Sequence, residues 1–172
     1  KFGTAIEFDG VGESVELGSD PGLSNTDNFS VSFWFKRTQD AISWSENNVN
    51  NVMLSLRGSN GSSLEIGSEG YKAEVFLTTE EQSERVMPDA TIANGQWHHL
   101  ALSYDASREN ELQLYVDGTS RGKWSQFGGK FLVNADAVLR LAMADPANPS
   151  KGRFEGLIDD LRIHSGTLSD DD

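Results

Sequence analysis

The clearest indication of the fold class is the stretch Phe29-Ser30-Val31-Ser32-Phe33-Trp34-Phe35-Lys36. Its phenylalanines and valine occupy every second position, so they share one face of an extended strand, and the serines, tryptophan and lysine share the other. A strand with one fully apolar face buries that face against a second layer of structure. The stretch therefore predicts a central strand in a sheet that packs on another sheet.

Short apolar runs of the same kind continue on both sides of this strand, separated by clusters of Gly, Asn, Ser and Asp. No window of helical length keeps a 3.6-residue period, which argues for an all-β chain. We expect about ten to thirteen strands, too many for a small barrel and enough for two stacked sheets. The further runs lie at 4–8, 15–17, 52–56, 64–66, 71–77, 97–104, 112–116, 137–141 and 157–163.

Two short segments predict tight hairpins. Asp117-Gly118 suits a type I′ turn, because both residues tolerate the positive φ that this turn needs. Gly58-Ser59-Asn60-Gly61 predicts a second hairpin loop. Longer loops are expected at 38–51, 80–88, 125–130 and 145–151, and such loops on a β-sandwich are where ligand contacts are sought.

Composition narrows the function. The 172 residues carry 14 Lys and Arg against 27 Asp and Glu, a formal net charge of −13, which argues against nucleic acid and anionic membrane surfaces. The chain has no cysteine, which excludes disulfides, zinc–thiolate sites and thiol nucleophiles. No apolar run approaches the ~20 residues of a membrane span. We expect one domain over residues 1–172, cut from a larger protein and monomeric when isolated.

Four segments together resemble the laminin-G-like and pentraxin-like domains of the concanavalin A-like lectin/glucanase superfamily. They are Ala5–Gly10, Phe29–Lys36, Gly95–Asp105 followed by Leu114–Gly118, and Phe154–Ile163. The resemblance implies a jelly-roll sandwich of two curved antiparallel sheets. It also implies a non-catalytic, extracellular binding module of a bacterial adhesin or polysaccharide-degrading enzyme. The ligand would be a glycan, or a peptide or protein surface; a structural spacer is the alternative.

The resemblance further implies a calcium ion (Ca2+) held by Asp9 together with Asp159, Asp160 or both. Asp159 has the phase of the apolar residues Leu157, Leu161 and Ile163, and an inward carboxylate is costly unless it is paired or binds a metal. Calcium prefers six to eight oxygen ligands and suits an acidic chain.

The calcium interpretation has an alternative. Asp9 would then be a turn residue, Asp160 would face solvent, and Asp159 would pair with Arg162 or Arg153. A second cation in a loop at the rim of the sandwich is a further hypothesis. The alternative is that these residues form ordinary Asx turns. The rim candidates are Asp20, Asp27 and Asn28, or Asp145 and Asn148.

Two tryptophans beside loops are candidates for stacking against sugar rings. Trp44 lies among polar residues that include Asn47 and Asn48, whose amides are able to hydrogen-bond sugar hydroxyls. Trp124 ends a hairpin arm. The alternative for each tryptophan is that it covers a sheet edge.

Catalysis has weak support. Related glucanases carry a strand of alternating carboxylates, and Glu65, Gly67 and Glu69 have that spacing without the central acid. The glycines at 67 and 70 favour a turn over a rigid strand. His98 and His99 are adjacent and point to opposite faces of a strand, so they are expected to be structural.

Overall fold

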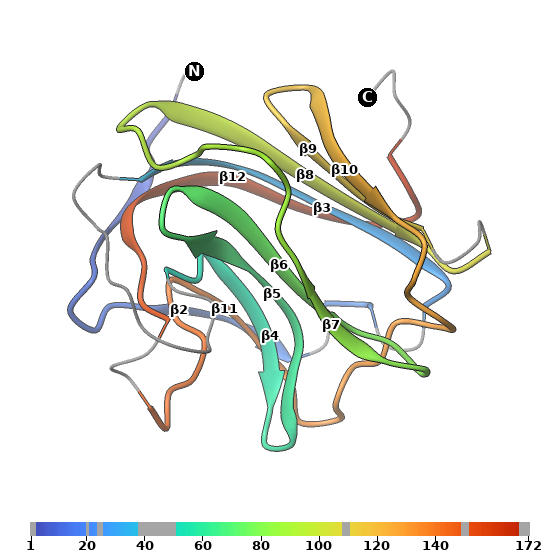
Figure 1. Cartoon of the computed structure of the whole chain (residues 1–172). Helices are drawn as coiled ribbons and strands as arrows, with labels where there is room; N and C mark the ends of the chain where they lie inside the picture. Colours follow the sequence, from blue (N-terminus) through green and yellow to red (C-terminus); the bar gives the residue numbers. More distant parts are fainter. Residues whose placement is uncertain are drawn as a thin grey trace.

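The computed structural model describes residues 3–19, 21–23, 26–37, 51–107, 111–148 and 152–168, and it contains strands and no helix over those residues. The strands form the two layers seen in Figure 1. Their bounds are β1 Ile6–Asp9, β2 Val15–Ser19, β3 Asn28–Arg37, β4 Leu54–Gly58, β5 Gly61–Glu69, β6 Lys72–Thr78, β7 Ser83–Val86, β8 Trp97–Asp105, β9 Glu111–Val116, β10 Thr119–Trp124, β11 Val138–Leu141 and β12 Glu155–Ser165.

Each layer is an antiparallel sheet of six strands. Sheet 1 has the order β1-β12-β3-β8-β9-β10, and sheet 2 has the order β2-β11-β4-β5-β6-β7. The first and last strands of the chain pair with each other in sheet 1, while β2 and β11 pair in sheet 2. The predicted all-β jelly-roll sandwich of two antiparallel sheets is therefore confirmed.

The core lies between the two sheets. Phe29, Val31, Phe33 and Phe35 of β3 have no exposed surface, and Leu54, Leu56, Leu64 and Ile66 face them from sheet 2 in the same buried cluster. Removing each such side chain from water contributes about 1.5–3 kcal/mol. The alternation in the sequence thus settles which face of β3 points inward.

A β-bulge in β12 changes the phase of the last strand. Register shifts between Asp159 and Arg162, and Asp160 has a positive φ of 52°. Before the bulge Ile158 is the buried residue, and after it Leu161 and Ile163 pack against the core. Asp159 pairs with Trp34 on the outer face of β3. The expectation that Asp159 points inward with Leu157 is therefore wrong, because the extra bulge residue reverses the alternation.

Both predicted hairpins form. Asp117 and Gly118 have φ values of 54° and 70° between β9 and β10, and Gly58 pairs with Gly61 across the β4–β5 turn. Over the described residues there is no helix long and apolar enough to cross a membrane.

Candidate functional site

A row of side chains, all polar except one phenylalanine, crosses the outer face of sheet 2. Inward positions of these strands hold leucine, isoleucine and valine, so the alternate positions face away from the core. The strand register aligns one outward residue from each strand across the whole sheet. These residues are Glu16, Arg140, Ser55, Glu65, Phe76 and Arg85, in strand order from β2 to β7.

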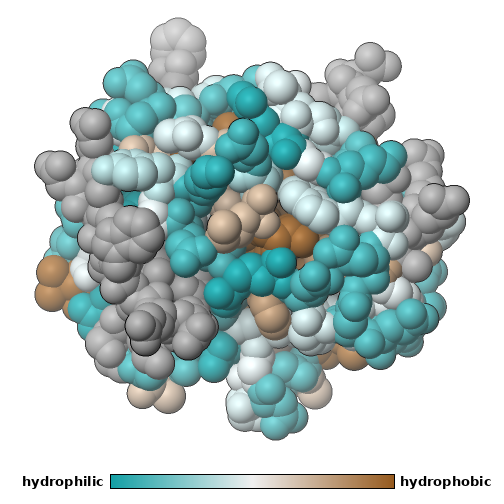
Figure 2. Space-filling model, viewed as in Figure 1, coloured by the Kyte–Doolittle hydropathy of each residue, from teal (hydrophilic) through white to brown (hydrophobic). Residues whose placement is uncertain are grey.

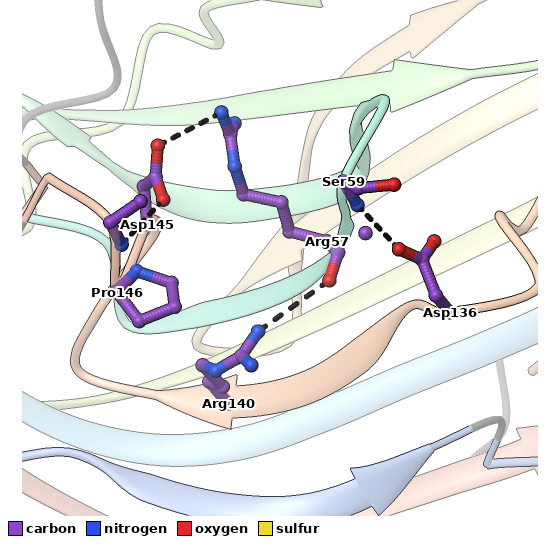
Figure 3. Close-up of a pocket in the computed structure, with 8 residues that line it drawn as sticks. Arg57, Ser59, Asp136, Arg140, Asp145 and Pro146 are labelled. Atoms are coloured by element: carbon purple, nitrogen blue, oxygen red, sulfur yellow. Dashed lines mark hydrogen bonds and ion pairs between the residues drawn. The ribbon is translucent and has the colours of Figure 1, made fainter.

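A pocket of about 240 Å³ opens beside this row, between the start of the β4–β5 turn and the segments flanking β11 (Figure 3). Such a volume holds about eight water molecules, which suits a single small ring better than a long chain. Its lining is Arg57, Gly58, Ser59, Asp136, Arg140, Asp145, Pro146 and Ala147.

Arg57 of β4 is held from both sides. Its Nη2 donates to Asp145 Oδ2 at 3.1 Å, and its Nη1 donates to Ser62 Oγ at 2.7 Å. Glu65 Oε1 lies 3.5 Å from the same Nη1 and accepts a hydrogen bond from the Ser62 hydroxyl. Because every partner is fixed on a strand or a short turn, the guanidinium is pre-oriented at the pocket.

Arg140 of β11 forms the opposite wall. Its Nε donates to Glu16 Oε1 at 2.9 Å, and its Nη1 lies 3.5 Å from the carbonyl oxygens of Arg57 and Val138. Only about a tenth of its side chain is exposed, so it has lost most of its rotamer freedom before any ligand arrives.

Asp136 closes the side of the pocket next to the β4–β5 turn. Hydrogen bonds from Ser59, including its backbone N–H at 2.9 Å to Oδ2, hold the pKa of the Asp136 carboxyl below its ordinary value. Gly58 permits this approach, since a Cβ there would lie 2.3 Å from Asp136 Oδ1. Asp136 is therefore an ionised, exposed acceptor at neutral pH.

Further along the same face, Phe76 of β6 packs against Val52 and Ala144. Figure 2 shows an apolar hollow near the centre of the view, over the sheet that contains β4 to β7, ringed by hydrophilic residues.

Glu74 lies beside Phe76, is fully buried, and has its Oε1 2.6 Å from Arg85 Nε. Burial raises the Glu74 pKa to about 7, nearby Glu69 and Glu65 add to the increase, and Arg85 opposes it.

The pocket thus alternates hydrogen-bond donors and acceptors. Guanidinium groups donate, and the carboxylates of Asp136 and Asp145 accept. Pro146 and Ala147 supply a small apolar wall. Fixed donors and acceptors around an apolar wall are the groups that recognise a polyhydroxylated ring, because each hydroxyl both donates and accepts.

The structure does not bring the predicted calcium ligands together. Asp9 pairs with Glu155 across β1 and β12, so Asp159 lies four residues further on, roughly 13 Å along the strand. Asp9 Oδ1 accepts the Val11 N–H at 2.7 Å, as in an Asx turn. Asp160 binds Arg162 through Nε at 3.1 Å and Nη2 at 3.0 Å.

These aspartates therefore do not fit a shared calcium site. Among the residues that the structure describes, no group of three or more His, Asp or Glu side chains is placed to hold a metal ion. Calcium dependence stays a prediction, carried by the family resemblance alone.

The predicted rim cation sites show turn geometry where they are described. Asp145 Oδ1 accepts the Ala147 N–H at 2.9 Å, and the Asn148 N–H donates to the Asp145 carbonyl at 3.0 Å. Asp27 lies 3.3 Å from Lys130 Nζ, and the Asn28 N–H donates to Thr26. Asp20 lies outside the described residues.

The predicted sugar-stacking residues divide into two groups. Trp44, Asn47 and Asn48 lie outside the described residues, so their role stays a prediction. Trp124 ends β10 at the edge of sheet 1, on the opposite layer from the pocket. Its ring packs on the core and over Gly122, where a Cβ would lie 2.2 Å from Trp124 Cη2.

The alternating acids at 65–69 lie in a strand, because β5 continues to Glu69. The turn expected at Gly67 comes later, at Gly70 and Tyr71. The partner of Gly67 is Glu74 of β6, which places a carboxylate from the neighbouring strand beside the missing central acid. Glu65 is held by Arg57 and the Ser62 hydroxyl, so it belongs to the polar network beside the pocket.

The two histidines face opposite sides of β8, as predicted. His98 is mostly buried; its Nδ1 lies 2.7 Å from Asp117 Oδ2 and its Nε2 lies 2.9 Å from Asn94 Oδ1. His99 packs beside the Trp34 ring on the outer face of sheet 1. Neither histidine lies at the pocket.

Sequence reasoning missed the two arginines of the pocket. The loops that carry Ser59 and Asp145 were both expected from the sequence, at 58–61 and 145–151. Strand alternation also places Arg57 and Arg140 outward. Their convergence depends on β4 pairing with β11, a contact between segments about 80 residues apart.

Comparison with known proteins supports the architecture. A laminin G family model, described as the concanavalin A-like lectin/glucanases superfamily, matches residues 9–172. No curated protein matches the sequence at a significant level.

Among solved structures, the CBM40 module of Ruminococcus gnavus IT-sialidase, bound to α2,3-sialyllactose, has a TM-score of 0.73 and 17% identity, over 97% of this chain and 92% of that chain. Domain 4 of AbnA, an extracellular arabinanase of Geobacillus stearothermophilus in complex with arabinotriose, has a TM-score of 0.66 and 23% identity, over 99% and 75%.

The receptor-binding domain of botulinum neurotoxin mosaic serotype C/D has a TM-score of 0.73 and 17% identity, over 98% of this chain. This chain spans only 40% of that domain. At these identities the likenesses show a shared fold.

Proposed function

Because this chain belongs to the concanavalin A-like lectin/glucanases superfamily, we propose that it is a non-catalytic module that binds a glycan through the pocket between the β4–β5 turn and the segments flanking β11. The observation that carries the proposal is the pair of pre-oriented guanidinium groups, Arg57 and Arg140, facing the Asp136 and Asp145 carboxylates around a pocket of about 240 Å³. This arrangement offers fixed donors and acceptors to the hydroxyls of one sugar ring.

Two structures of the same fold support the choice of ligand class. The sialidase module is described with sialyllactose and the arabinanase domain with arabinotriose, so the fold carries glycan sites in other proteins. The arabinanase is described as extracellular. We propose the same setting here, a secreted or cell-surface bacterial protein in which this domain supplies adhesion or substrate targeting.

The proposal is tested on a glycan array, followed by titration calorimetry with the best ligand. Asp136→Ala and Arg140→Ala should each weaken binding at least about tenfold, since each removes a charge-assisted hydrogen bond. Arg121→Ala is the matched control, because this exposed arginine lies on β10 of the other sheet. Circular dichroism and Tm measurements identify variants that fail to fold.

Three outcomes would contradict the proposal. An array without any bound glycan would favour a structural spacer or a peptide- or protein-binding domain. Equal weakening by Arg121→Ala would place the site elsewhere. Release of reducing ends from β-glucans, agars or alginates would indicate a glucanase-like enzyme.

A further inference from the structure

Carboxylates outnumber guanidinium groups around the pocket. Arg57 and Arg140 are its two lining cations. Each is already matched by acids, Arg57 by Asp145 and Glu65 and Arg140 by Glu16. With Asp136, four carboxylates surround two guanidinium groups.

Asp136 is the charge that has no cationic partner within the part of the chain that the structure describes. Its carboxylate is bound by Ser59 and stays ionised at neutral pH. The close approach of Gly58 fixes it at the wall of the pocket. A ligand that enters the pocket therefore meets an uncompensated negative charge.

The groups left for a ligand suit hydroxyls. Arg140 Nη2 makes no hydrogen bond to the described residues and is a donor, while the Asp136 and Asp145 oxygens are acceptors. A sugar hydroxyl accepts a hydrogen bond from the arginine and donates one to a carboxylate oxygen. A ligand carboxylate only accepts, so it would leave these protein acceptors unmatched and would repel them.

We infer that this pocket selects uncharged sugars and discriminates against carboxylated ones such as uronic or sialic acids. The inference rests on the proposed function and names the ligand class of the same pocket. Two unit charges about 4 Å apart in water repel enough to weaken binding about fivefold, and partial burial strengthens the effect. The discrimination decreases with added salt, because Asp136 is exposed and its charge is screened.

The test begins with an array in which neutral and carboxylated glycans are equally represented. The best neutral glycan is then compared by calorimetry with its uronic-acid analogue, which differs by a carboxylate. We expect the hits to fall among neutral glycans and the acid to bind at least about fivefold more weakly at low salt. Asp136→Asn should reduce the ratio of the neutral glycan's affinity to the acid's affinity several-fold. Asp89→Asn, the same charge change at an exposed residue paired with Lys72, should leave the ratio unchanged.

The outcomes separate the two proposals. Hits among carboxylated glycans, or an acid that binds as tightly as its neutral analogue, would overturn the selectivity while the glycan-binding function stands. An unchanged ratio in Asp136→Asn would overturn the role of this carboxylate. Binding of no glycan at all would overturn the proposed function and the selectivity together.

Discussion

Replacing Glu74 by glutamine should change how the stability of this domain depends on pH. Glu74 of β6 is fully buried on the outer face of sheet 2, and burial is the largest cause that raises its pKa from 4.5 to about 7. The glutamine side chain is nearly isosteric and stays neutral at every pH.

The sign follows from proton linkage. Between pH 4.5 and about 7 the folded protein holds a proton on Glu74 that the unfolded chain has released, so the free energy of unfolding decreases as pH increases through this window. The difference between the two pKa values corresponds to about 3 kcal/mol. Below pH 4.5 Glu74 is protonated in both the folded and the unfolded state, and its contribution to the free energy of unfolding is fully present. Above pH 7 that contribution is lost.

The assay is urea unfolding of the wild type and Glu74→Gln from pH 4 to pH 8. The free energy of unfolding of the variant minus that of the wild type should increase by about 3 kcal/mol from pH 4 to pH 8. The weaker contact of the glutamine with Arg85 lowers the stability of the variant by an amount that does not depend on pH, so it leaves this increase unchanged. Glu84→Gln on the neighbouring strand β7 removes the same charge and serves as the control. A stability difference that does not change with pH would refute the reasoning.

Three further predictions concern a glycine at a close strand contact, the core between the sheets and the response to added calcium. Gly156→Ala should cost about 2 kcal/mol or more in urea unfolding, because φ is +146° and the new Cβ would lie 2.2 Å from the Lys36 carbonyl oxygen; a neutral result would contradict the close β12–β3 approach. Phe33→Ala should cost about 3–5 kcal/mol, because the side chain is fully buried between the sheets, and a loss below 1 kcal/mol would contradict that packing. Added calcium should raise Tm, and a chelator should reverse the shift. Because Asp9 accepts a hydrogen bond in a turn and Asp160 binds Arg162, Asp9→Asn and Asp160→Asn should each leave that shift unchanged, and loss of the shift in both variants would mean that the two residues share one ion.

Much of the candidate site could not be found in the sequence. The outward placement of Arg57 follows from alternation along β4, and the turn at Ser59 follows from its glycines. Their meeting with Arg140 and Asp136 depends on which strand lies beside β4. Strand order is set by packing over the whole sandwich, so no local pattern reports it.

Local sequence patterns were enough to predict the all-β sandwich, the core face of β3 and the β9–β10 hairpin. These features depend on alternation and turn chemistry within a few residues. The phase of β12 depends on long-range strand pairing, because the bulge at Asp160 reverses the side chains around it. The same is true of the pairing of Asp9 with Glu155 and of the pocket that two arginines and two aspartates line. Contacts of this kind join distant segments, and their geometry emerges only when the two sheets pack.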